Sequence, residues 1–452
     1  MPIQILTIAR NAFVEAVRQP VLIVMVLLCA VLLVFTTGST GFAMGMSTSA
    51  EVHGDDKLLF DVGLATVFVL GLLLAAFLAT ADVSREIEDK TVLTVVSKPV
   101  SRASIILGKY LGVTGAILIG VAAMLVVLLM AIRHGVMTTA ADDVQWQIVL
   151  FGVLAAGIAL GVGIWGNFFY GWSFPQTATV LLLPLLVLAY LGTLLISGKW
   201  EVQPIGKDFK PQVLLACLAV LLSMPVICAV ATAASTRLGQ VMTIVVVAGV
   251  FLLGLLSNHL FGRHAIVNES MGRIVRIESV QGSEDAFTEP GHRLRVELVR
   301  PANQNLLPGN SIYYGPNPNG IGLAVRPFPP FTGDPTSMSD LASPDAPSGV
   351  VLLSSRDNIV LTIRRVGRNP NAVARPPRVD DYVFAEPTRI SPLPLALWGV
   401  IPNMHYFWLI DAVTQNNPIP LSYLVYLGLY TAAQIGALLA LGIALFQRRD
   451  VG

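Results

Sequence analysis

A charged stretch between two long apolar runs constrains this chain more than any other feature. The stretch from Asp82 to Gly112 is rich in Arg, Lys, Glu and Asp, whereas the residues on both sides are almost entirely apolar. Each of those charges would cost about 2.5–3.5 kcal/mol at the centre of a membrane span. The charged stretch must therefore lie outside a bilayer that the flanking runs enter.

The composition of the whole chain is that of an integral membrane protein. Of its 452 residues, 54% are hydrophobic and 13% are charged, whereas soluble domains carry about a quarter charged residues. The formal net charge of +1 gives no reason to expect a nucleic-acid partner. The cysteines Cys29, Cys217 and Cys228 all lie in apolar runs, so they predict no disulfide framework.

Eight apolar runs approach or reach the 17–25 residues that a transmembrane helix requires. Pro184 and Pro225 are expected to interrupt the fifth and the sixth. The expected fold class is a mainly α-helical polytopic membrane protein of about eight transmembrane helices, seven of them within residues 21–257. The runs are 21–35, 58–81, 105–132, 148–165, 177–196, 213–234, 241–257 and 421–446.

Residues 1–20 form a separate amphipathic segment before the first run. Ile5, Ala9 and Ala12 recur at helical spacing on one side, and Gln4 and Glu15 lie on the other. The pattern predicts an interfacial helix at the headgroups. No small-residue cleavage site comes directly after it, so a retained anchor is favoured over a signal peptide.

The basic residues in the short loops indicate how the helices are oriented. Eight spans put both termini on one side of the membrane, and cytoplasmic loops carry an excess of Lys and Arg. Both termini and the charged stretch are therefore expected in the cytoplasm, although losing one of the fourth and fifth spans would invert the orientation of every later span. Arg10, Arg18, Arg85, Lys90, Lys98, Arg102, Lys109, Arg237, Arg448 and Arg449 lie on the proposed inner side, against Lys57, Arg133, Lys199, Lys207 and Lys210 outside.

The segment between the last two spans changes in composition. Within residues 258–390, apolar and polar residues alternate in short runs that are separated by Pro, Gly and Asn, most clearly at 293–300 and 358–364. This pattern predicts an inserted β-rich extracytoplasmic domain, a sandwich or a barrel. Residues 391–420 are apolar and aromatic but broken by prolines, which predicts an interfacial or re-entrant segment. The last helix and a cytoplasmic C-terminus occupy 421–452.

The charged stretch also carries a series of residues that resembles the permease subunits of ABC-2-type ABC transporters. In that family, the loop after the second span has an Arg/Glu-rich run, a Thr, an apolar stretch, then Pro-Val-Ser-Arg and Gly-Lys. Lys90 stands where many members have Gly. The resemblance covers roughly residues 1–262 and 391–452, and two extra spans and the outer domain depart from it. The matching positions are Glu86, Glu88, Thr91, Pro99, Val100, Ser101, Arg102, Gly108 and Lys109.

The resemblance implies the membrane subunit of an ATP-driven exporter in a bacterial inner membrane. Its implied partners are an ABC ATP-binding subunit and a second permease subunit, in a homodimer or a heterodimer, within the lipid bilayer. A polar helix at about 82–98 would be the coupling helix that contacts the ATP-binding subunit. The residues expected to bind that partner are Arg85, Glu86, Glu88, Thr91, Val92, Val95, Pro99 and Arg102.

ATP and Mg²⁺ are expected on the partner subunit rather than on this chain. The phosphate-binding pattern Gly-x-x-x-x-Gly-Lys-[Ser/Thr] does not occur in the sequence. His259 and His264 have no further metal ligands close in sequence, so a metal site is not favoured. No catalytic, cofactor-binding or metal-binding residue is therefore predicted, and ATPase activity is assigned to a separate chain.

Two other function classes remain as alternatives. In the first, the complex translocates nothing and transmits the ATP cycle to the outer domain, which acts on an envelope protein or lipoprotein as an extracytoplasmic partner. In the second, the chain is an ion-coupled transporter or a membrane enzyme. Carboxylate pairs such as Asp142 and Asp143 lie outside the spans, and this argues against the second class.

Overall fold

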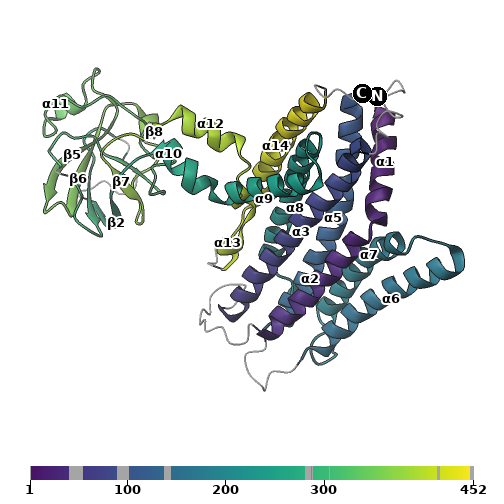
Figure 1. The fold of residues 1–452 in the computed structure, drawn as a ribbon. Helices are drawn as coiled ribbons and strands as arrows, with labels where there is room; N and C mark the ends of the chain where they lie inside the picture. Colours follow the sequence, from purple (N-terminus) through teal and green to yellow (C-terminus); the bar gives the residue numbers. More distant parts are fainter. Residues whose placement is uncertain are drawn as a thin grey trace. The chain divides into compact units, whose positions relative to one another are not determined.

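The chain folds into two compact units. The computed structural model describes residues 2–39, 54–88, 101–136, 144–279, 287, 289–304, 306–414 and 418–447. The first unit, here called the helical unit, comprises Met1–Leu255 and Pro402–Gly452, and the second, the sheet unit, comprises Leu256–Ile401 (Figure 1).

The helical unit contains the long apolar helices. Eight helices in the described residues are long and apolar enough to cross a membrane, which confirms the prediction of about eight spans. The amphipathic α1 precedes them, and the short η2 (Ile205–Lys207), η5 (Met404–Phe407) and α13 (Ile410–Thr414) connect them. The helices are α1 (Pro2–Arg18), α2 (Pro20–Ser39), α3 (Gly54–Glu88), α5 (Arg102–His134), α6 (Trp146–Tyr170), α7 (Phe174–Leu195), α8 (Pro211–Ser235), α9 (Gln240–Ser257) and α14 (Leu421–Gln447).

Helices α3, α5 and α8 form the interior of the helical unit. In the apolar stretches of α3 and α8, 67% of the residues are buried, against 22% in α6. Helix α5 packs against α1, α2, α3, α7, α8 and α14. Helices α6 and α7 lie side by side as a hairpin at the edge of the unit (Figure 1).

Two glycines of α5 allow α1 to approach closely. A Cβ atom at Gly112 would lie 2.7 Å from Ala12 Cβ and would also meet the Ala9 carbonyl oxygen. A Cβ atom at Gly108 would lie 2.7 Å from Ile8 Cβ. Small residues at a helix contact permit this backbone approach. The buried residues Ala9, Ala12, Ala16 and Val17 of α1 accordingly form its packed side.

The two prolines expected to interrupt spans lie inside continuous helices. Pro184 is within α7 and Pro225 is within α8, and both helices run on past them. A proline removes one backbone donor, but packed neighbours can stabilise the helix around it. At Pro225, the hydroxyl of Tyr110 donates a hydrogen bond of 3.2 Å to the proline carbonyl. The prediction of a break was therefore wrong at both positions.

Part of the aromatic segment before α14 packs into the helical unit. Met404 and Phe407 of η5 are buried in the core of this unit. Trp408 stacks on Phe68 of α3 with ring centroids 6.1 Å apart. The Tyr423 hydroxyl donates to the Tyr406 carbonyl at 2.7 Å. No helix of spanning length occurs in the described part of residues 391–420, and the interfacial placement of this segment stays a prediction.

The sheet unit is built from short antiparallel strands, as the alternating pattern predicts. Leu294, Val296 and Leu298 on β3 are buried, as are Leu361 and Ile363 on β6. Helical turns lie around the strands: η3 (Asn258–Gly262), α10 (Arg263–Ala265), α11 (Met338–Leu341), η4 (Pro370–Ala372) and α12 (Pro392–Val400). The strands are β1 (Ile266–Val267), β2 (Ser270–Ser279), β3 (Arg293–Leu298), β4 (Tyr313–Gly315), β5 (Gly349–Arg356), β6 (Val360–Val366), β7 (Tyr382–Phe384) and β8 (Arg389–Ile390).

The main sheet closes into a small barrel. Its strand order is β4-β7-β2-β3-β6-β5, with antiparallel pairing throughout. The residues just before β4 pair with the opposite edge strand, because Ile312 N donates to Val350 O at 2.8 Å and Leu352 N donates to Asn310 O at 2.9 Å. Closure removes the open sheet edges. Of the two architectures expected from the sequence, the barrel is therefore the one observed.

Buried arginines fix the loops of the sheet unit. Arg365 is 1% exposed and donates to the carbonyls of Phe287 at 2.7 Å and Asn369 at 2.9 Å. Burial lowers the pKa of its guanidinium. Arg375 instead binds both carboxylate oxygens of Asp381 at 2.6 Å. Bidentate geometry of this kind gives the stronger class of charged hydrogen bond.

The close approach of α1 and α5 can be tested at one glycine. Replacing Gly112 by Ala forces the new methyl group into α1, and overpacking of this kind typically costs about 1–3 kcal/mol. We expect a lower thermal unfolding midpoint for purified Gly112→Ala in detergent. Gly115→Ala is the matched control, because a Cβ atom there lies 3.4 Å from its nearest neighbour in Phe13. Equal midpoints for the two variants would show that the approach is not tight.

Candidate functional site

The residues predicted to bind a partner lie at or between the ends of two long helices. Arg85, Glu86 and Glu88 are near the C-terminal end of α3, and Arg102 is the first residue of α5. The remaining four, Thr91, Val92, Val95 and Pro99, lie outside the described residues. The structure therefore places the two borders of the predicted coupling segment, and the contacts of the segment stay a prediction.

Helix α3 continues well past its apolar stretch. That stretch ends at Thr80, whereas the helix runs without a break to Glu88. At 1.5 Å per residue, the eight residues from Ala81 to Glu88 extend the helix by about 12 Å. The first residues of the polar segment are thus helical, but they continue the span rather than begin a separate helix. A force applied at Glu88 would act directly on the span.

The start of α5 is fixed by a serine cap. Ser101 has an extended backbone, and its hydroxyl accepts a hydrogen bond of 3.1 Å from Ser104 N. An N-cap serine satisfies one of the backbone donors that the first helical turn leaves unpaired. Ser101 therefore marks the end of the polar segment, and α5 enters the apolar interior from Arg102 onward.

Two arginines bind the C-terminal end of α14 near this helix start. Arg102 Nη1 donates to the carbonyls of Phe446 at 3.3 Å and Gln447 at 3.0 Å. Arg237, in the turn between α8 and α9, donates through Nε to Leu445 O at 3.0 Å. Cations are favourable at the negative end of a helix, where the last carbonyls lack partners. These contacts join α5, α8 and α14 beside the polar segment.

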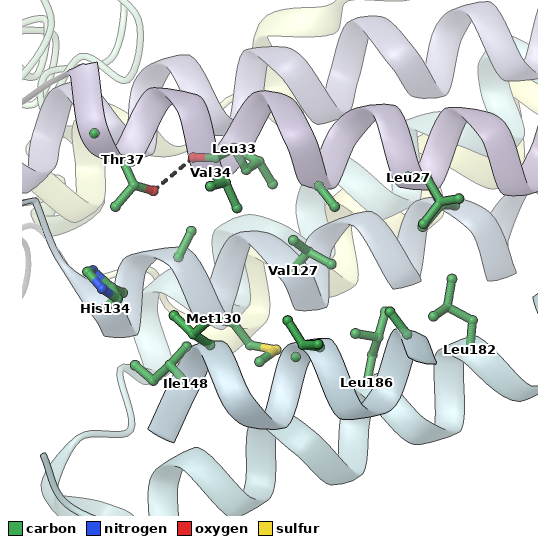
Figure 2. Close-up of a pocket in the computed structure, with 18 of the residues that line it drawn as sticks. Leu27, Leu33, Val34, Thr37, Val127, Met130, His134, Ile148, Leu182 and Leu186 are labelled. Atoms are coloured by element: carbon green, nitrogen blue, oxygen red, sulfur yellow. Dashed lines mark hydrogen bonds between the residues drawn. The ribbon is translucent and has the colours of Figure 1, made fainter. Parts of the chain in front are cut away.

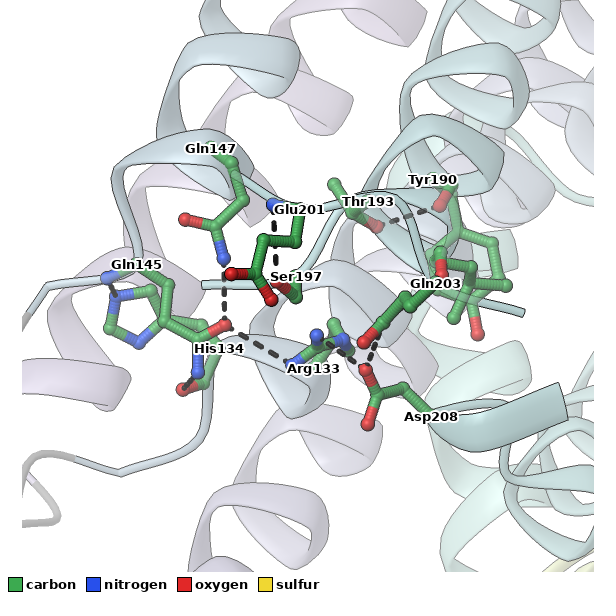
Figure 3. Close-up of polar contacts among 11 residues, drawn as sticks. Arg133, His134, Gln145, Gln147, Tyr190, Thr193, Ser197, Glu201, Gln203 and Asp208 are labelled. Atoms are coloured by element: carbon green, nitrogen blue, oxygen red, sulfur yellow. Dashed lines mark hydrogen bonds and ion pairs between the residues drawn. The ribbon is translucent and has the colours of Figure 1, made fainter. Parts of the chain in front are cut away.

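A second polar cluster lies at the opposite end of α5. Arg133 Nη2 donates to Asp208 Oδ2 at 2.6 Å, and Arg133 Nη1 donates to Gln145 Oε1 at 3.1 Å (Figure 3). Gln147 Nε2 also donates to Gln145 Oε1, at 3.1 Å, and Gln203 donates to Asp208. The Arg133 and Asp208 side chains are 14% and 26% exposed. The cluster joins the end of α5 to the start of α6 and to the loop after α7.

Sequence reasoning treated Arg133 as an ordinary loop charge and did not single out Asp208. Arg133 ends an apolar run, and its partner is 75 residues further along the chain. The one available signal was a basic residue directly at the end of a span, where a partly buried arginine requires a carboxylate. A tertiary contact between the end of α5 and the loop after α7 supplies that carboxylate.

The two histidines beside the seventh span, His259 and His264, both contact an arginine. Arg263 donates to His264 Nε2 at 3.1 Å and contacts His259 Nε2 at 3.2 Å. Within the described part of the chain, no group of three or more His, Cys, Asp and Glu side chains is arranged to hold a metal ion. The histidines thus contribute to a polar contact in the sheet unit.

One family model matches the part of the chain that contains the charged stretch. Residues 6–164 match a family described as ABC-2 family transporter protein. The match begins in α1, includes the polar segment between α3 and α5, and ends inside α6. Neither the curated proteins nor the solved structures include a match to this chain.

The contact between Arg102 and α14 predicts a stability effect. Hydrogen bonds to charged groups contribute about 1.5–3 kcal/mol, so Arg102→Ala should lower the thermal unfolding midpoint measurably. Arg102→Lys keeps the charge and should recover part of the loss. Arg10→Ala, on the exposed side of α1, should leave the midpoint unchanged. If Arg10→Ala and Arg102→Ala behave alike, the bonds to α14 contribute nothing.

Proposed function

We propose that this ABC-2 family transporter membrane protein is the permease subunit of an ATP-driven exporter. A separate ATP-binding subunit hydrolyses ATP, and a second permease subunit completes the transporter in a bacterial inner membrane. The single observation that carries the proposal is the family match over residues 6–164, since it includes the polar segment between α3 and α5. Export as the direction is inferred from the family resemblance of that segment.

The continuity of α3 supports a coupling role for the polar segment. Packed helices move as rigid units rather than bending continuously. Helix α3 runs from the apolar interior to Glu88 without a break, and its apolar stretch is largely buried against α5 and α8. Movement of the ATP-binding subunit against the segment would therefore shift α3 and the helices packed on it. Both termini lie in the cytoplasm in this arrangement, as the basic residues indicate.

Replacing Glu88 and Val92 by Ala tests the coupling role. We expect the double variant to bind the ATPase subunit that copurifies with the wild-type chain with a Kd at least tenfold higher. A tenfold change in Kd corresponds to about 1.4 kcal/mol of binding free energy. Stimulation of the subunit's ATPase rate should fall in parallel. The double change Glu201→Ala and Val202→Ala is the matched control, because both residues are exposed in the loop at the other end of the helices. Unchanged association and stimulation in the Glu88/Val92 variant would contradict the proposal.

A second candidate function is favoured by the sheet unit. This unit has its own buried core and a barrel closed by backbone hydrogen bonds, so it has the structure of an independently folded domain. In this alternative, the ATP cycle acts through the membrane helices on the sheet unit, which binds an envelope protein or lipoprotein, and no substrate crosses the membrane.

The way the sheet unit is inserted allows a clean deletion. Ile266 of β1 pairs with Ile390 of β8, and Ser391 N donates to Ala265 O at 2.9 Å. Residues 266–389 can therefore be replaced by Gly-Gly, because the segment that leads into the strands and the segment that leaves them already lie next to each other. If the alternative is right, the shortened protein still stimulates the ATPase subunit but no longer binds an envelope protein that the full chain binds. Adding that envelope protein should change the ATPase rate of the full complex and leave the rate of the shortened complex unchanged. A shortened complex that still exports its substrate would exclude the alternative.

A further inference from the structure

A cavity of about 420 Å³ lies inside the helical unit between α2, α5, α6 and α7. Side chains of all four helices point into it, among them Leu33 and Val34 of α2, Met130 of α5 and Leu186 of α7 (Figure 2). Close-packed protein interiors contain few voids larger than a water molecule, and this volume lies within the range of small-molecule sites. The cavity is therefore large enough to hold a bound molecule.

The chemistry of the walls restricts the occupant to an apolar group. Among the described residues of the lining, Thr37 and His134 are the ones with polar side chains, and both make hydrogen bonds within the chain. The Thr37 hydroxyl donates to Leu33 O at 2.8 Å. His134 Nε2 accepts a hydrogen bond from Gln145 N at 3.3 Å, which leaves Nδ1 as the donor to Gly135 O at 3.0 Å. A buried water requires two to four polar partners, whereas the other described residues of the lining are apolar or Gly.

The cavity opens toward the surface that faces lipid. Val34 of α2 and Val153 of α6 line it, yet they are 72% and 64% exposed. Helices α2 and α6 each pack on neighbouring helices, and the cavity lies between them (Figure 2). Both belong to the set that is long and apolar enough to cross the membrane. The medium next to the opening is therefore hydrocarbon rather than water.

The length of the cavity matches one leaflet. Its lining on α2 runs from Val26 to Gly38, which is about 18 Å at 1.5 Å per residue. The hydrocarbon of one leaflet is about 15 Å deep, half of a core of about 30 Å. The end marked by Gly38 and His134 lies where α2 and α5 end, and the exposed Trp146 begins α6 there. Tryptophan is enriched at the headgroup level.

We propose that this cavity binds one acyl chain of a bilayer phospholipid, with the headgroup at the His134 end. The chain fills the space between α2 and the α6–α7 hairpin, so the hairpin packs on the rest of the helical unit partly through lipid. This inference rests on the walls and the opening of the cavity, and it is independent of the transported substrate and of the ATP-binding partner.

A phenylalanine in the wall should displace the lipid. We reconstitute the chain in vesicles of dioleoyl phosphatidylglycerol and phosphatidylethanolamine, extract it, wash it with detergent and count bound lipids by native mass spectrometry. We expect one phospholipid retained by the wild type and at least tenfold less in Ala156→Phe, which lines the cavity. Gly157→Phe is the matched control, because a Cβ atom at this position would have no neighbour within 4 Å, and this variant should retain the lipid.

Two results would overturn the proposal. One is equal retention by Ala156→Phe and Gly157→Phe. The other is a wild-type protein that retains no phospholipid, or retains only detergent, combined with a higher unfolding midpoint for Ala156→Phe. That combination would show that the cavity is empty of lipid and that the phenylalanine fills it.

A second measurement needs no variant, so it remains informative if Ala156→Phe fails to fold. A phospholipid with a photoreactive diazirine in its acyl chain is added to the wild-type protein, washed and illuminated. Labelling should be found on the buried wall residues Met130 and Ile148. Labelling confined to the outward residues Ile158 and Val162 of α6, which are 48% and 39% exposed, would show that only the surface of the helix meets lipid.

Discussion

Helices in a bilayer gain little from leaving lipid for protein, so their association depends on close packing of small and complementary surfaces. In this chain that packing is concentrated on α5. Its glycines admit α1 on one side, and its Tyr110 and Thr114 reach α8 on another, through Pro225 O and Cys228 Sγ. The two ends of α5 carry the polar groups that hold the neighbouring elements, Arg102 at one end and Arg133 at the other. The spans α2, α3, α6, α7, α8 and α14 all pack on this one helix.

The position of α5 also explains how the charged stretch is connected to the interior. The chain leaves the membrane at the end of α3 and returns at the serine cap of α5, and α3 and α5 are neighbours in the core. The polar segment thus links two of the most buried helices rather than two peripheral ones. In the proposed function, this is the mechanical reason why a subunit bound outside the bilayer would move the centre of the bundle and not its edge.

Local patterns in the sequence predicted the elements well, and they failed where distant residues meet. Apolar run length predicted the eight spans, and alternation predicted the strands, because hydrocarbon thickness and the strand repeat act on neighbouring residues. Closure of the barrel depends on Ile312 and Val350, which no local pattern connects. The same holds for Arg133 with Asp208, and for the cavity walls. At Pro184 and Pro225 the local rule predicted a break, but packing around α7 and α8 keeps each helix continuous.

The bonds from Arg102 and Arg237 to the last carbonyls of α14 have a consequence for biosynthesis. Helix α14 is synthesised after both arginines, because Arg102 and Arg237 precede it in the chain. The acceptors at Leu445, Phe446 and Gln447 lie 208 residues or more further along the chain than the arginines that bind them. A product that ends before α14 would lack them, leaving the ends of α5 and α8 near the two arginines without the segment that joins them. This end of the bundle therefore assembles only after α14 has been synthesised.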